Sequence, residues 1–168
     1  MGHNLDPAGD ESLTISGRWR LVTTIPRINP IANGFRFAVY DNNGTLLYTR
    51  VVPPGLAPSR AAPGWHTNSR VTSWTFRDPS GTLAGGISTV RVRNTSNGAA
   101  PNRYSFAVHG KESDFQVQSS ETPTQFTVVL GGQVQSDASQ CARTAFGPTG
   151  GPAPACKLMR NGNVLSCR

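Results

Sequence analysis

The sequence predicts an all-β fold, an antiparallel β-sandwich, and three observations support this prediction. Apolar and polar residues alternate along several short segments, which is the period of a half-buried strand. The chain has 18 glycines and 13 prolines but only 15% charged residues, a composition typical of strands and turns. Its 168 residues suit one domain, and we expect a flexible tail over residues 1–11 and a single sandwich domain over residues 12–168.

The first half of the chain predicts a long strand followed by a hairpin. In residues 12–25, Leu13, Ile15 and Trp19 share one side of the alternation, so we expect one long strand, or two strands with a bulge at Gly17. An Asn-Gly turn joins the hairpin strands at residues 34–40 and 45–52, because this pair accepts the positive φ of tight turns. Residues 53–64 contain four prolines and predict an extended connection.

The second half predicts more short strands. In the first of them Trp74 and Phe76 face inward, and a change of parity between Ile87 and Val90 indicates a bulge in the next. A turn is expected at residues 110–113. The expected strands are residues 71–77, 87–94, 103–109, a segment around 115–117, and 124–130, the last one central because it is apolar on both faces.

A weak internal repeat links the two halves. The segment FRFAV at residues 35–39 recurs as YSFAV at residues 104–108, each followed by a polar turn and a second alternating strand. If the repeat is genuine, the sandwich consists of two related meanders that face each other. The alternative is chance, because a two-residue pattern makes such matches easy.

The three cysteines lie near the end of the chain. With Asn161-Gly162 as a two-residue turn, Cys156 falls opposite Cys167 on the partner strand. Opposed cysteines lie within disulfide reach, so we expect a Cys156–Cys167 bridge in a C-terminal cysteine hairpin that closes the domain of an exported protein. A competing bridge from Cys141 to either partner stays open; otherwise Cys141 is a buried thiol or an intermolecular link.

Arginine dominates the charge of the chain. The net charge is +7, carried by fourteen arginines and two lysines. Several arginines alternate with inward apolar residues; they are Arg18, Arg20, Arg36, Arg91, Arg93 and Arg103. If their strands are neighbours, they form one basic sheet face suited to an acidic polysaccharide, to lipopolysaccharide phosphate or to nucleic acid. If the strands are divided between two sheets, these arginines are only solvated residues.

The tryptophans offer a second candidate ligand site. Trp19 and Trp74 share the apolar side of their strands and are expected in the core. Trp65 follows the proline-rich connection, so it is the tryptophan expected to lie exposed, as a platform on which a sugar ring can stack.

The sequence shows no motif for catalysis, for a metal or for a cofactor. It contains no Gly-x-Ser-x-Gly elbow and no phosphate-binding Gly-x-x-x-x-Gly-Lys, and His3, His66 and His109 are scattered. We therefore expect a protein without enzymatic activity, metal or cofactor. No apolar stretch approaches the ~20 residues of a membrane span, and the start lacks the features of a signal peptide. If the protein is exported, we expect that its signal was removed before this chain begins or that the chain is an excised domain.

Several runs resemble a poorly characterised domain at the C-terminal ends of secreted or surface bacterial proteins, especially those of deltaproteobacterial type. They are SWTFRD at residues 73–78, GGI at 85–87, FAVHGK at 106–111, QCARTAF at 140–146 and the cysteine hairpin. The similarity covers mainly residues 71–168, and its motifs are structural. Ala142 and Arg143 stand where the family pattern has Gly and an acid. The resemblance implies an exported, β-rich accessory module and carries no known site.

Two functions are therefore expected. The first is a non-catalytic extracellular structural or interaction module, a subunit of a surface assembly that self-associates through strand edges, with the long first strand donated to a neighbour. The alternative is a module that binds a glycan or another polyanion through the arginine face or through Trp65. An enzyme without a recognisable motif is the third and weakest hypothesis.

Overall fold

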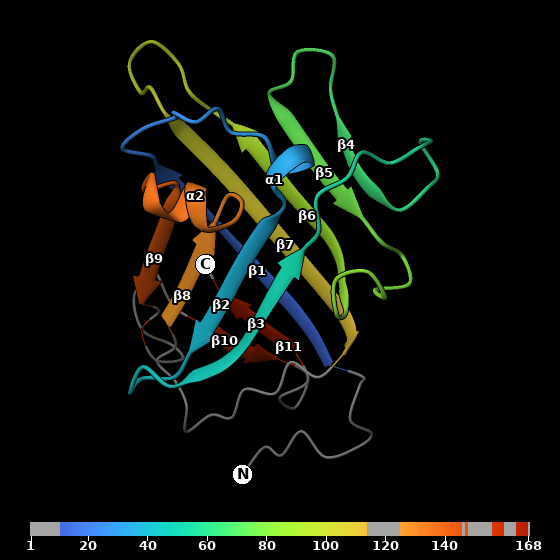
Figure 1. Cartoon of the computed structure of the whole chain (residues 1–168). Coiled ribbons are helices and arrows are strands. Elements are labelled where there is room, and N and C mark those ends of the chain that lie inside the picture. The colour runs from blue at the N-terminus through green and yellow to red at the C-terminus, as the bar shows by residue number, and fades with distance from the viewer. Residues whose placement is uncertain (1–10, 114–124, 146, 148–155, 160–163, 168) are drawn as a thin grey trace.

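The computed structural model describes residues 11–113, 125–145, 147, 156–159 and 164–167. This part of the chain is mostly β, with two short helices and two sheets that face each other (Figure 1). Aromatic rings of the two sheets contact each other. Phe106 of one sheet packs against Phe35 and Phe126 of the other, with ring centroids 6.5 and 5.7 Å apart. The prediction of an all-β fold is confirmed, and the arrangement of the sheets is sandwich-like.

The larger sheet has seven strands. In spatial order they are β10 (Cys156–Met159), β11 (Val164–Cys167), β1 (Glu11–Arg20), β7 (Arg103–Ser113), β6 (Ile87–Asn94), β5 (Ser73–Arg77) and β4 (Gly64–Thr67). Neighbours run antiparallel except β1 and β11, which run parallel with Ile15 opposite Cys167. The predicted antiparallel arrangement is thus confirmed for every described pair of neighbouring strands except this one. A short turn enforces an antiparallel partner only between strands adjacent in sequence, and these two lie at opposite ends of the chain.

The smaller sheet has four antiparallel strands. In spatial order they are β3 (Leu46–Val52), β2 (Phe35–Tyr40), β8 (Gln125–Val129) and β9 (Cys141–Ala145). The predicted hairpin is confirmed as β2 and β3. In its turn, Asp41 Oδ1 accepts hydrogen bonds from the N–H groups of Asn43 and Thr45 at 2.8 and 2.7 Å. Desolvation opposes them, but these bonds hold the pKa of the Asp41 carboxyl below its usual value.

The core lies between the sheets and matches the predicted inward residues. On β2 the alternation buries Phe35, Phe37 and Val39, while Trp74 and Phe76 of β5 are 2% and 1% exposed. Each fully buried side chain of this kind contributes about 1.5–3 kcal/mol relative to an exposed one. β8 lies between β2 and β9, as its apolar character on both faces predicted.

Gly17 faces the core without a bulge. β1 keeps an unbroken register with β7 from Leu13 to Arg20, and the irregularity lies between Glu11 and Leu13. A Cβ on Gly17 would lie 2.7 Å from Cε1 of Phe106. The glycine therefore makes room for this ring, which also contacts Trp19 with centroids 4.8 Å apart. Of the two alternatives, one long strand or two strands with a bulge at Gly17, the structure has the single strand; here the missing side chain marks a close approach instead of a bulge.

Strand ends differ from the predictions in several places. β1 begins at Glu11, which we assigned to the tail, and ends at Arg20 instead of residue 25; Leu21 N–H instead bonds the carbonyl of Asn102 at 2.9 Å. β7 continues through residues 110–113, where a turn was predicted, because Gly110 still pairs with Leu13. The predicted bulge in β6 is confirmed between Ile87 and Thr89. The expected strand around residues 115–117 lies outside the described residues.

Four elements were not predicted. They are the helix α1 (Pro30–Asn33), the helix α2 (Gln133–Asp137) and the strands β4 and β9. The two related segments of the repeat do lie in different sheets, as β2 and β7. The sheets nevertheless have seven and four strands in different orders, so they are not two copies of one meander.

The C-terminal strands extend the larger sheet. β10 pairs antiparallel with β11, and the Cα of Cys156 lies opposite that of Cys167. The side chains of both cysteines and the expected Asn161-Gly162 turn lie outside the described residues, so the disulfide stays a prediction. Cys141 is a free, exposed cysteine on β9. The expectation that Cys141 is buried is wrong, because it lies on the outward parity of this strand.

Candidate functional site

Five of the six arginines singled out in the sequence share the outer face of the seven-stranded sheet. Strand alternation turns Trp19 of β1 and Val92 of β6 toward the core, so the arginines on either side of each point outward. We call this surface the basic face. Its arginines are Arg18 and Arg20 of β1, Arg91 and Arg93 of β6, Arg103 of β7 and, in addition, Arg77 of β5.

Four neighbouring strands carry the basic face. β1, β7, β6 and β5 lie side by side, and the four-stranded sheet covers their inner side in front of them (Figure 1). The basic face is therefore the side turned away from the viewer. Arg77 was not among the predicted site residues, although its alternation with Trp74 and Phe76 already indicated that it points outward.

Strand register determines how the arginines are spaced. Arg20 lies directly opposite Arg103. Arg18 and Arg93 both pair with Ser105, from the two sides of β7, so they occupy one row two strands apart. With strands ~4.8 Å apart, this row separates their backbones by roughly 10 Å. The predicted condition for a single basic face, that the strands be neighbours, is met for these residues.

The surroundings of these arginines are small and uncharged. All six are exposed, and their guanidinium groups make no hydrogen bond or ion pair within the described part of the chain. The residues between them on the four strands are Thr14, Ser16, Ser73, Thr75, Thr89, Ser105 and Ala107. Among the described side chains of this face none is a carboxylate. The positive charge is therefore uncompensated by the face itself and available to an anionic ligand.

Three further basic residues border the arginines. His109 of β7 lies beside Thr14, with Nδ1 and Oγ1 3.4 Å apart. Lys111 follows on the same strand, and His66 of β4 lies opposite Thr75. Lys111 extends the cationic surface toward one end of β7, and the two imidazole rings lie beside the arginines.

Arg36 does not belong to the basic face. It points outward from β2 on the other sheet, where it is half-buried and lies opposite Val51 and Val129. The prediction that Arg36 lies on one face with the other five arginines is therefore wrong. Strand alternation predicts that a residue points outward, but it does not tell on which of two sheets the strand lies.

Trp65 is not an exposed platform. It is fully buried in β4, and its ring packs against Phe76 with centroids 5.6 Å apart. Its Nε1–H donates a 2.8 Å hydrogen bond to the carbonyl of Pro53. The proline-rich connection thus folds back over the ring and buries it. A sugar ring cannot stack on Trp65, so the predicted ligand platform at this residue is wrong.

Asp78 is an acid whose role is structural. It is fully buried in the turn after β5, where its carboxylate accepts hydrogen bonds from Ser80 Oγ and from the N–H of Leu83, both at 2.7 Å. The buried carboxylate thus organises the β5–β6 connection.

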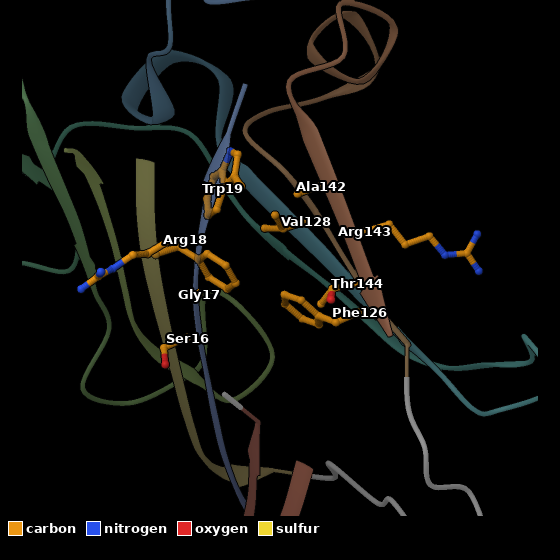
Figure 2. A pocket seen from close by; sticks show the side chains of 10 residues that line it. Ser16, Gly17, Arg18, Trp19, Phe126, Val128, Ala142, Arg143 and Thr144 are labelled. Atoms are coloured by element: carbon orange, nitrogen blue, oxygen red, sulfur yellow. The ribbon is translucent and has the colours of Figure 1, made fainter. Parts of the chain in front are cut away.

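A slot of about 390 Å³ opens between β1 and β9, at one flank of the sandwich (Figure 2). Rings and aliphatic groups line most of it, including Trp19, Phe126 and Val128. Arg18 and Arg143 border the slot, but their side chains extend away from it (Figure 2). Its described lining therefore provides an apolar surface without the converging polar groups that catalysis requires.

The described residues offer neither a cluster of metal ligands nor a membrane-spanning helix. Within the described residues no three His, Cys, Asp or Glu side chains come together as metal ligands. None of the described helices is long and apolar enough to cross a membrane.

Comparison with protein-family models, with curated proteins and with solved structures found no significant match to this chain. What the protein does is therefore inferred from its own geometry.

Proposed function

We propose that the protein is a non-catalytic extracellular binding module whose basic face holds an acidic polysaccharide. The observation that carries this proposal is the set of six exposed arginines on four neighbouring strands, with no described carboxylate among them. Arginine presents a planar fork of donors that matches carboxylate and sulfate groups bidentately. A row of such groups on a rigid sheet favours a polymer with repeated negative charges.

Buried aromatic rings favour a saccharide over single-stranded nucleic acid. Proteins that bind single strands stack bases on exposed aromatic side chains. On the strands of the basic face, Trp19, Trp74, Phe76, Tyr104 and Phe106 all point to the core side. Among the described side chains, the face itself offers guanidinium, hydroxyl and methyl groups, which suit anionic and hydroxyl groups of a glycan.

Binding is tested by retention on a sulfated polysaccharide. We expect the protein to bind immobilised heparin at low salt and to lose most of this binding by ~0.2 M salt, as electrostatic contacts with a polyanion do. Immobilised neutral dextran is the matched control and should not retain it. Stronger retention on single-stranded DNA of equal charge density would favour nucleic acid instead. No retention on heparin at low salt would contradict the proposed function.

The extracellular location is supported by the cysteine pair. Cys156 and Cys167 are cross-strand neighbours, and disulfides persist in oxidising compartments. The resemblance to domains of secreted bacterial proteins points the same way. For the purified protein we expect an intact mass lower by two hydrogen atoms than the reduced chain, with Cys141 as the thiol that reacts with maleimide. Three reactive thiols would count against the bridge and against export.

Self-association through sheet edges is the second proposal, for a structural module in a surface assembly. It is supported by the open sheets, whose terminal strands are β10 and β4 in one and β3 and β9 in the other. The edge of β4 is partly covered, since Trp65 N–H and C=O bond Gly55 and Ala57. β1 is not free for donation to a neighbour, because it pairs with β7 and β11. Sedimentation velocity should show concentration-dependent association; a monomer at all concentrations would contradict this proposal.

A further inference from the structure

We infer that the basic face binds an extended, linear polyanion that crosses the strands obliquely, along a diagonal track formed by its six arginines. This inference rests on the proposed function and specifies its ligand. It depends on where the strand register puts each arginine, not on their number.

The register places the arginines from one corner of the face to the opposite one. The track begins where Arg20 of β1 lies opposite Arg103 of β7. It continues two residues along β1 at Arg18, which shares its row with Arg93 of β6. Arg91 follows two residues along β6, toward the end of the sheet at which Arg77 lies. Each step thus moves along a strand, across to a neighbour, or both.

The final step reaches β5. Arg77 pairs with Thr89, which lies two residues beyond Arg91 on β6. With ~3.4 Å per residue along a strand and ~4.8 Å between strands, successive arginines are roughly 5–10 Å apart. From Arg20 to Arg77 the same spacings give about 25 Å. The track is therefore longer than a compact anion and matches a stretch of polymer.

Small residues flank the track. At one off-diagonal corner lie Thr14, Ser16 and Ala107, and Ser73 and Thr75 lie on the other side. The basic residues off the diagonal are His66, His109 and Lys111. The arginines themselves avoid these two off-diagonal corners. A straight polyanion laid along the diagonal therefore meets all six arginines, whereas one laid parallel to the strands meets two or three.

This arrangement selects for chain length. A polymer that spans the track places an anionic group near every arginine, because several modest contacts on one chain act together. A compact multivalent anion reaches only two or three guanidinium groups. The ligand class is therefore a linear sulfated or carboxylated polysaccharide of at least ~25 Å, the length set by the strand spacings.

The test moves an arginine without changing the charge. The variant Arg91→Thr/Ser16→Arg keeps the guanidinium in the same row but shifts it two strands off the diagonal. The control variant Arg143→Thr/Thr127→Arg moves a guanidinium by one strand on the four-stranded sheet, away from the track. Circular dichroism and thermal unfolding must first show that both variants fold like the unmodified protein.

Heparin fragments of increasing length are then titrated by calorimetry at low salt. For the unmodified protein, affinity should rise steeply until the fragment spans ~25 Å, the length of the track, and then level off. The off-diagonal variant should bind the longest fragment about fivefold more weakly, and the control within about twofold of the unmodified protein, since one lost contact is worth roughly a factor of five. Inositol hexasulfate, a compact anion, should bind both variants equally.

The outcomes separate the two proposals. Equal affinity of both variants for long fragments, with heparin still bound, would overturn the diagonal track and leave polyanion binding standing. Affinity that does not depend on fragment length would do the same. No binding of any heparin fragment to the unmodified protein would overturn the proposed function and the track together.

Discussion

The outer faces of the two sheets treat arginine differently. On the seven-stranded sheet the arginines are exposed, lie among Ser, Thr and Ala, and make no described hydrogen bond or ion pair. On the four-stranded sheet Arg143 bonds Oε1 of Gln125 and lies over the ring of Tyr40, with Cζ 5.7 Å from its centroid. Arg36 of that sheet is half-buried between two valines.

The surroundings of an arginine therefore indicate its role better than its exposure alone. A guanidinium already satisfied by an amide and a ring has less to gain from a ligand, whereas an unpaired guanidinium keeps its full capacity. The four-stranded face also exposes apolar side chains, Val51 at 59% and Leu46 at 50%. The two faces therefore present different chemistry to the surroundings, although both follow from the same alternation.

The largest expected effect comes from removing arginines from one face only. Arg77→Thr/Arg91→Thr/Arg93→Thr should weaken heparin binding on the order of 100-fold, at ~1 kcal/mol for each lost contact. The charge-matched control removes three arginines from elsewhere, namely Arg36, Arg60 and Arg143. Calorimetry at low salt should find the control within about threefold of the unmodified protein. An equal loss in both variants would mean that net charge, rather than the basic face, determines binding.

The tightness of packing in the core between the two sheets can be tested at Gly17. Gly17→Ala places a Cβ 2.7 Å from the Phe106 ring, which Phe35, Trp19 and Phe126 hold from other sides. We expect this overpacking to lower the free energy of unfolding by about 1–3 kcal/mol in urea denaturation. Ser16→Ala on the outer side should change it by less than about 0.5 kcal/mol. An unchanged stability of Gly17→Ala would show that the ring relaxes freely.

Trp65 separates stability from binding. Trp65→Phe removes the hydrogen bond from Nε1 to the carbonyl of Pro53 and part of the packing on Phe76. The free energy of unfolding should fall by about 1–2 kcal/mol, while heparin affinity at low temperature, measured on folded protein, should stay within about twofold. If binding were lost at unchanged stability, Trp65 would contact the ligand and the basic face would not be the sole site.

The smallest expected effect is on the free energy of unfolding, which an Arg→Thr substitution should raise on one face and lower on the other. Arg20 and Arg103 are like charges directly opposite each other, so Arg103→Thr should raise the free energy of unfolding by a few tenths of a kcal/mol at low salt. Arg143→Thr loses the contacts with Gln125 and Tyr40 and should lower it by a similar amount. Thermal denaturation at low and at ~0.5 M salt checks both, since salt screens only the repulsion. Two changes of the same sign would contradict the contrast between the faces.

Local patterns predicted much of the fold because their causes are local. The alternation of β2, the turn at Asp41 and the bulge in β6 follow from side-chain parity and backbone sterics within a few residues. The same parity assigned the outward arginines correctly. It failed for Trp65, because the cover over its ring comes from the connection around Pro53, which the alternation of β4 does not report.

Polarity alternation is written in the order of the residues, so the chain determines which side chains face inward and which face outward along each strand. Which strands become neighbours depends on long-range packing, such as the contact of Phe106 with Phe35 and Phe126 across the two sheets. Only that packing places five of the six predicted arginines on one face, adds Arg77, and sends Arg36 to the other sheet. Its physical basis is that burial rewards any complementary pairing of apolar faces, and the pairing that fills the interior is a property of the whole chain.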